Sequence, residues 1–176
     1  MNIDAPLAPS GGSFAQALHA AGPDPALAGR LGLYGWLVGA WEMDVVRHLA
    51  DGGTVRTDGE IHFGWVLGGR AIQDVWIAPR RPAPAGMFGT TLRVYDPATD
   101  AWHIIWSDPV KQYFSRQVGR AEGKDIVQTG TNADGEQTRW RFTDITGQSF
   151  RWLGERIFTG TTDWRLEVEF HARRVA

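Results

Sequence analysis

Apolar and polar side chains alternate along most of this chain of 176 residues. The alternation has a period of two, which is typical of a strand with one buried face. The expected strands cover residues 38–48, 54–65, 70–77, 88–95, 101–107, 112–120, 125–131, 137–145, 149–158 and 163–173. Turn sequences such as Asp51-Gly52-Gly53 and Asp96-Pro97 separate them. Because no helical pattern interrupts the series, the sequence predicts an all-β, antiparallel meander.

A meander of about ten strands is expected to close into an up-and-down barrel. Closure removes the exposed strand edges that would otherwise pair with other chains. The interior of a barrel of this size is either filled by side chains or holds one small ligand. In the last strand, Arg165, Glu167, Glu169 and His171 alternate with apolar residues, which predicts a row of charged side chains facing water.

The residues before the first strand predict a short helical plug. Asp24 and Pro25 suit the cap and first position of a helix, and Leu27, Leu31 and Tyr34 follow at helical spacing. We expect a helix over residues 24–36 that covers one end of the barrel. Ser13 is expected to cap a shorter helix over residues 14–19.

The expected domain organisation is simple. Residues 1–23 form a mobile N-terminal arm, and residues 24–176 form a single β-barrel domain. Residues 80–86 make the one long, proline-rich loop, which is either a mouth or lid of the barrel or a plain connector.

Tryptophan is the composition feature that changes this picture. The chain has nine Trp, and seven lie on predicted strands: Trp41, Trp65, Trp76, Trp102, Trp106, Trp152 and Trp164. Each carries a large apolar surface and one N–H that needs a partner. So many strand-borne indoles indicate either a thick core or the wall of a ligand cavity.

Charge and cysteine content exclude several classes of function. The formal net charge of −2 and the lack of basic runs argue against nucleic acid or an anionic membrane as partner. The chain has no Cys, which excludes disulfides, thiolate catalysis and zinc–thiolate sites. We see neither a signal peptide nor an apolar stretch of ~18 residues, so we expect a cytoplasmic protein. A homodimer is left open.

Gly39-Ala40-Trp41, at the head of the first predicted strand, resembles the Gly-x-Trp motif of the calycin group, which contains lipocalins and fatty-acid-binding proteins. The resemblance implies a calycin-like barrel in which Trp41 fills the closed end. It also implies that an arginine near the last strand, Arg173 or Arg174, packs on this ring by cation–π attraction.

A fuller set of motifs resembles the DUF1579-like family of uncharacterised bacterial proteins. The matching segments run in order through residues 36–173 and comprise residues 37–42, Leu67-Gly68-Gly69-Arg70, Tyr95-Asp96-Pro97 with Trp102 and Trp106, residues 144–152 and Thr162-Asp163-Trp164. The resemblance implies the barrel fold. It implies no particular activity, because a fold does not determine a function.

Nitrobindin-type haem proteins share this barrel shape more distantly. They open with Gly-x-Trp-x-Gly and ligate haem through a histidine near the end of the chain, whereas this chain has Met43 at the second glycine position and His171 as its last histidine. We therefore expect no cofactor. The five His show no metal-ligand spacing, so we also expect no metal site.

The leading functional prediction is binding of a small apolar or aromatic ligand inside the barrel. The expected wall consists of Trp65, Trp76, Trp106 and Trp152. The polar groups expected to orient the ligand are Arg70, Gln73, Asp74 and Gln128. Ligand cavities commonly combine an apolar wall with a few polar anchors.

Two alternatives remain at this stage. The first is a cofactor-independent lyase, isomerase or cyclase that uses a buried acid/base group, with Asp74 as the weak catalytic candidate. Desolvation beside Trp76 would raise the pKa of this carboxyl, whereas an ion pair with Arg70 or Arg93 would make it structural. The second alternative is a barrel with a solid core that serves self-association only.

Overall fold

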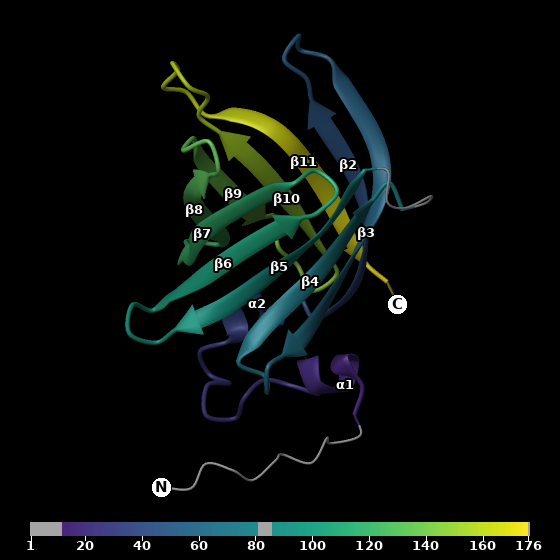
Figure 1. Cartoon of the computed structure of the whole chain (residues 1–176), viewed down its shortest axis with the longest axis vertical. Helices are drawn as coiled ribbons and strands as arrows, with labels where there is room; N and C mark the ends of the chain where they lie inside the picture. The colour runs from purple at the N-terminus through teal and green to yellow at the C-terminus, as the bar shows by residue number, and fades with distance from the viewer. Residues whose placement is uncertain (1–11, 81–85, 176) are drawn as a thin grey trace, which may run out of the picture.

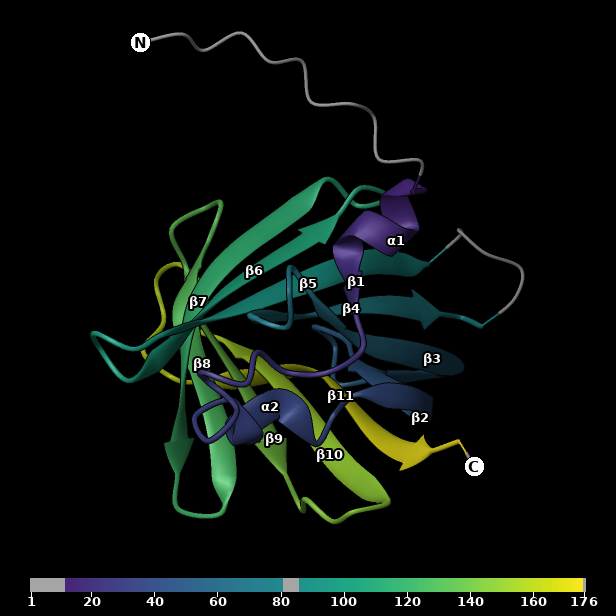
Figure 2. The same cartoon turned by 90° about the horizontal axis from the view of Figure 1, so that it is seen from below.

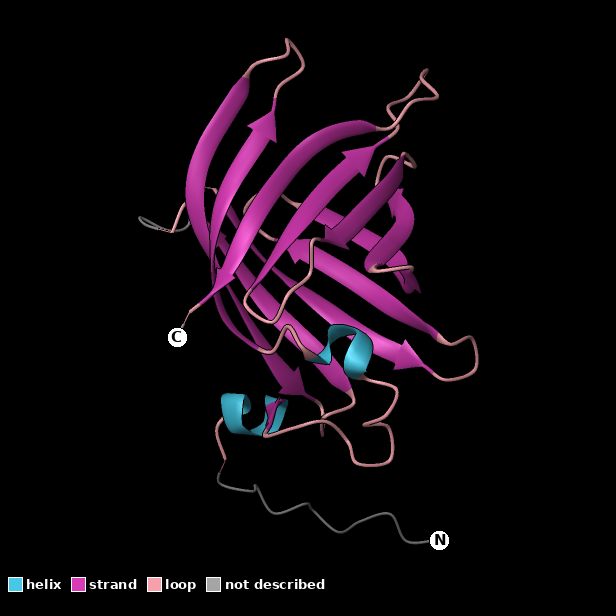
Figure 3. Cartoon of the chain, turned by 180° about the vertical axis from the view of Figure 1, so that it is seen from behind, coloured by secondary structure: helices cyan, strands magenta, loops and turns pink. Residues whose placement is uncertain are grey.

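The protein is described here by a computed structural model covering residues 12–80 and 86–175. One antiparallel sheet of eleven strands dominates the described chain (Figure 1, Figure 3). Ten strands form the barrel: β2 (Gly39–His48), β3 (Thr54–Val66), β4 (Ala71–Ala78), β5 (Met87–Asp96), β6 (Ala101–Asp108), β7 (Tyr113–Glu122), β8 (Asp125–Asn132), β9 (Gln137–Thr143), β10 (Ser149–Arg156) and β11 (Arg165–Arg174). The predicted strands are confirmed.

The barrel closes through one pairing between strands that are not neighbours in the sequence, β11 with β2. Strand β3 pairs with both β2 and β4. Every strand of the barrel is therefore hydrogen-bonded on both sides, which confirms the predicted closed antiparallel barrel. The additional strand β1 (His19–Ala20) pairs with the end of β3. No helix in the described segments is long and apolar enough to cross a membrane.

Two short helices lie at one end of the barrel, α1 (Phe14–Leu18) and α2 (Gly32–Gly35), as Figure 2 shows. The capping box between Ser13 and Gln16 opens α1, as the sequence predicted. Of the predicted arm, residues 12–23 hold α1 and β1, and residues 1–11 lie outside the described residues.

The helical plug is shorter than predicted. Only Gly32–Gly35 is helical, and turns occupy residues 25–31. Asp24 forms an ion pair with Arg70 at 2.8 Å, and its backbone N–H donates to the carbonyl of Gly69 at 3.0 Å. These contacts hold residues 24–36 against the β3–β4 turn. The glycines within residues 24–36 also disfavour a long helix.

Trp41 and Arg174 seal the closed end beneath this plug. The buried Trp41 indole donates from Nε1 to the carbonyl of Leu37 at 2.7 Å. The Arg174 Cζ atom lies 4.1 Å from the centroid of the Trp41 ring. The expected packing of an arginine on this tryptophan is confirmed for Arg174, whereas Arg173 pairs with Asp44 on the outer surface. The other end of the barrel is consequently the one that can open.

An ion-pair cluster on the outer wall joins β9 to β10. The Glu155 carboxylate accepts hydrogen bonds from both Arg139 and Arg141, with Nε to Oε2 distances of 2.8 and 3.0 Å. Burial opposes the ionisation of Glu155, but the hydrogen bonds and charges of the two arginines outweigh it. They hold the pKa of this carboxyl below its ordinary value.

The lowered pKa makes the contribution of Glu155 dependent on pH. Because the folded-state pKa is depressed, the stabilisation is present above the unfolded pKa and is lost as the pH falls through the folded value. We expect Glu155→Gln to lower the unfolding free energy by about 0.5–1 kcal/mol at pH 7. The difference in unfolding free energy between the variant and the wild type should become smaller in acid. Urea unfolding of both proteins at pH 7 and at an acidic pH measures this change. A difference independent of pH would contradict this assignment.

Candidate functional site

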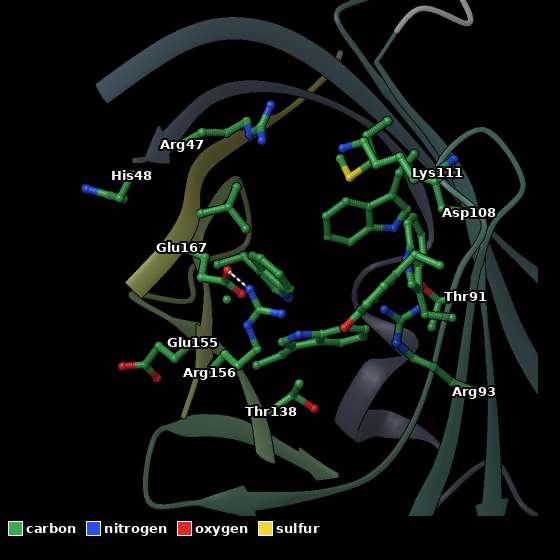
Figure 4. Close-up of a pocket in the computed structure, with 18 residues that line it drawn as sticks. Arg47, His48, Thr91, Arg93, Asp108, Lys111, Thr138, Glu155, Arg156 and Glu167 are labelled. Atoms are coloured by element: carbon green, nitrogen blue, oxygen red, sulfur yellow. Dashed lines mark hydrogen bonds and ion pairs between the residues drawn. The ribbon is translucent and has the colours of Figure 1, made fainter. Parts of the chain in front are cut away.

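A cavity of about 360 Å³ opens at the end of the barrel opposite α2 (Figure 4). Its lining comes from the last residues of β2, β4, β6 and β10 and from the first residues of β5, β7, β9 and β11. The two ends of the loop over residues 80–86 reach this same mouth, since β4 ends and β5 begins there. Residues 81–85 lie outside the described residues, so the predicted lid concerns a segment that the structure does not describe.

Four tryptophans form the apolar wall of the cavity. Trp76 contacts Trp106 and Trp152 edge to face, with ring centroids 5.8 and 5.5 Å apart. Trp140 adds a tilted contact to Trp152 at 5.7 Å. Beneath them, Phe170 stacks on Trp152 with 4.7 Å between the centroids. This cluster presents a broad aromatic surface that suits a flat or apolar ligand.

Two glycines allow these rings to lie against the sheet. A Cβ atom added at Gly89 would lie 2.5 Å from the Trp106 ring, and one added at Gly154 would lie 2.7 Å from the Trp152 ring. Neither position has room for a side chain while the indole keeps its place. The sequence therefore specifies the cavity wall partly through residues that contribute no side chain to it.

A buried ion pair lies at the inner end of the cavity. Asp74 accepts from the backbone N–H of Thr91 at 2.7 Å through Oδ1 and pairs with Arg93 through Oδ2. Both side chains are almost fully buried, and Arg93 also faces the rings of Tyr34 and Phe63. Each oxygen of the Asp74 carboxylate thus has a hydrogen-bond donor. This arrangement matches the structural role that the sequence left open for Asp74. The partner is Arg93 and not Arg70.

Other buried polar side chains form hydrogen bonds inside the barrel. The Gln128 amide donates to the Tyr34 hydroxyl at 2.9 Å, and the Gln117 amide donates to Thr138 at 3.0 Å. Burial raises the pKa of the Tyr34 phenol far above its ordinary value, so the hydroxyl is uncharged. Among the described residues, several buried atoms have no hydrogen-bond partner, including Trp76 Nε1, Arg93 Nε, Gln117 Oε1 and Gln128 Oε1. The interior therefore retains unused hydrogen-bonding capacity.

Charged side chains surround the mouth of the cavity. Arg156 pairs with Glu167 at 2.6 Å and also with Glu136 at 2.8 Å. Arg47 at the end of β2 and Lys111 in the β6–β7 turn line the mouth from different walls (Figure 4). Partial desolvation, together with the nearby Arg47 guanidinium, lowers the pKa of the Lys111 ammonium. The rim is thus polar, in contrast to the tryptophan wall below it.

Glu167 is not in the water-facing row that the alternation predicted. The register between β10 and β11 shifts by one residue, because Gly154 pairs with Val168 but Glu155 pairs with Leu166. Glu167 is the extra residue of this β-bulge, and its side chain lies at the mouth with Arg156. A bulge turns the following side chains to the other face, which simple alternation cannot anticipate.

The structure brings together three of the eight predicted ligand-binding residues in the cavity lining, namely Trp76, Trp106 and Trp152. Asp74 and Gln128 point into the barrel but lie deeper than the lining. Trp65 packs beneath the plug, where an added Cβ at Gly35 would lie 3.1 Å from its ring.

Arg70 and Gln73 were predicted to orient the ligand, but the structure places both outside the cavity. Arg70 lies on the outer surface in its ion pair with Asp24. Gln73 donates to Thr90 on the outside of the sheet at 3.0 Å. Because neighbouring residues of a strand face opposite sides, Gln73 points out where Asp74 points in.

Sequence reasoning missed Trp140 and the charged rim. Trp140 had a usable signal, since it alternates with Thr138 and Phe142, which are both buried. The place of Arg47 at the rim could have been inferred from the Gly-x-Trp motif, whereas Lys111 lies in the β6–β7 turn, on which the motif gives no information. If Trp41 marks the closed end of β2, the far end of the same strand must lie at the open end.

Histidine positions do not fit haem ligation. His171 pairs with Asp44 in the β11–β2 register and lies exposed on the outer wall of the barrel. His48 contacts Glu169 at 3.1 Å and points away from the cavity in Figure 4. Within the described ranges, no group of three His, Cys, Asp or Glu side chains is arranged to hold a metal ion.

Comparison with solved structures supports the fold. The crystal structure of Rv2717c from M. tuberculosis is similar to this chain with a TM-score of 0.59 and 13% sequence identity, covering 88% of this chain and 99% of that one. At this identity the likeness concerns the barrel fold alone. No family model and no curated protein matches the sequence.

Proposed function

We propose that this protein binds a small apolar or aromatic molecule in the cavity of its barrel. The observation that supports the proposal is the aromatic wall of Trp76, Trp106, Trp140 and Trp152 around a space of about 360 Å³. That volume suits one small organic molecule, and pockets of this kind are mostly apolar with few polar groups.

The alternatives from the sequence receive less support. A barrel with a solid core would leave no space of this size, so self-association alone does not account for the cavity. An enzyme with Asp74 as acid or base would need a free carboxylate oxygen facing the substrate. Both oxygens of Asp74 instead accept hydrogen bonds from Thr91 and Arg93.

We also propose that the protein belongs to the calycin group and that it is cytoplasmic. The order of the motifs over residues 36–173 supports a place in the calycin group near the DUF1579-like family. The absence of Cys from the chain is compatible with a cytoplasmic protein.

Replacing Trp106 should weaken ligand binding. N-phenylnaphthylamine, a neutral aromatic probe that brightens in apolar surroundings, should bind the wild type and quench its tryptophan fluorescence. We expect Trp106→Ala to reduce the binding free energy by ~1–3 kcal/mol, the range for removing one buried apolar side chain. Probe titration at a fixed protein concentration measures the effect.

Trp164→Ala is the matched control for this measurement. Trp164 packs on Arg139 outside the cavity, with 4.4 Å from the Cζ atom to the ring centroid. Its replacement removes one indole without touching the lining, so affinity should stay at the wild-type value. Equal affinity of wild type and Trp106→Ala would argue against this cavity as the binding site, as would failure of the probe to bind the wild type.

A further inference from the structure

Two cations at the mouth of the cavity have no carboxylate partner. In the described part of the chain, neither Arg47 nor Lys111 forms an ion pair, although both line the cavity. They come from β2 and from the β6–β7 turn, which lie on opposite sides of the barrel in the strand order. Figure 4 shows them facing one another across the upper part of the cavity.

The carboxylates that share the mouth are engaged elsewhere. Glu167 is held by Arg156 at 2.6 Å. Asp108 accepts from the backbone N–H groups of Val110 and Lys111, both at 3.0 Å, and so stabilises the turn. The negative charge of Asp108 still acts on the neighbouring Lys111, but neither carboxylate forms an ion pair with Arg47 or Lys111 in the described part of the chain.

The proximity of the two cations is electrostatically unfavourable. Burial, and next the charge of the Arg47 guanidinium, lower the pKa of Lys111, while the charge of Asp108 opposes this shift. Like charges held near each other destabilise the protein unless an anion lies between them. Cations that have no ion-pair partner in a cleft also raise the local concentration of anionic ligands.

From this arrangement we infer that the ligand is an amphiphile with one anionic group, bound with its apolar or aromatic body on the tryptophan wall and its anion between Arg47 and Lys111 at the mouth. The inference rests on the proposed binding function and specifies the chemical class of the ligand. A guanidinium and an ammonium from two walls can clamp a carboxylate or sulfonate, because both donate charge-assisted hydrogen bonds. An uncharged apolar ligand would contact the tryptophan wall only and would gain nothing from the two cations.

Two probes that share one skeleton test the inference. Anilinonaphthalene sulfonate is N-phenylnaphthylamine with a sulfonate added, so the pair isolates the contribution of the anion. The wild type should bind the anionic probe more tightly than the neutral one. Arg47→Gln and Lys111→Gln should each weaken the anionic probe about 3- to 10-fold and leave the neutral probe unchanged.

Arg116→Gln is the control for overall charge. Arg116 is exposed on the outer wall in β7, and its replacement removes one positive charge from outside the cavity lining. It should bind both probes as the wild type does. If all three variants weakened the anionic probe equally, general attraction rather than a clamp would be responsible, and the inference would be wrong.

The remaining outcomes separate this inference from the proposed function. Binding of the neutral probe in a manner sensitive to Trp106→Ala, without any preference for the anionic probe, would overturn the clamp and leave the cavity as the binding site. Failure of both probes to bind would overturn the proposed function and the clamp together. Loss of both probes in Arg47→Gln or Lys111→Gln would show that these residues shape the mouth rather than recognise an anion.

Discussion

Replacement of Asp74 by Asn is expected to lower the free energy of unfolding by about 3–5 kcal/mol, one of the two largest effects in this molecule. The variant keeps the shape of the side chain but removes the charge that compensates Arg93. Because Arg93 is only 1% exposed, its guanidinium would be left buried without a counter-charge. Chemical denaturation at pH 7, followed by tryptophan fluorescence, measures the loss.

A second variant distinguishes an unpaired charge from damage to the fold. Asp74→Asn combined with Arg93→Met removes both charges, so no buried charge is left without a counter-charge. The double variant should therefore recover much of the stability lost in the single one, as a double-mutant cycle would show. Asp58→Asn, at an exposed carboxylate of β3, should change stability little. An unchanged denaturation midpoint in Asp74→Asn would contradict the structural role of the pair.

Replacement of Trp41 by Ala is expected to cost ~3–5 kcal/mol, as large aromatic truncations in cores do. The indole is fully buried, packs edge to face on Trp36 and Phe150, and supports Arg174 on its other face. Its removal would open a void beneath the plug and leave the Leu37 carbonyl without its donor.

The same denaturation measurement checks this expectation. Trp41→Phe should lose less than Trp41→Ala, since it keeps part of the ring packing. Trp164→Ala, which removes an indole from outside the barrel, should have a small effect. A midpoint in Trp41→Ala equal to that of the wild type would show that the closed end does not depend on this residue.

Period-two alternation was sufficient to predict the strands, because each strand of a closed barrel has one face in the core and one in water. It also placed Asp74 and Trp76 on one face of their strand, and the structure turns this face inward. The same rule shows that Gln73 could not join them. The Gly-x-Trp motif predicted the contact between Trp41 and an arginine of the last strand.

The site was harder to predict because it depends on register between strands. Whether Asp74 pairs with Arg70 or Arg93 is decided by the β4–β5 register, in which Asp74 lies opposite Thr91. The place of Glu167 depends on a bulge that shifts β10 against β11 by one residue. Neither feature has a local sequence signal, since both arise only when distant strands pair.

The position of a bound probe tests the central claim most directly. A crystal structure of the protein with N-phenylnaphthylamine should show the probe inside the barrel, with its rings against Trp76, Trp106 and Trp152. Binding there requires the open end to be the end opposite Trp41. A probe found only on the outer wall, for example on the exposed Ile105 and Phe114, with the tryptophan-lined space unchanged, would contradict the account.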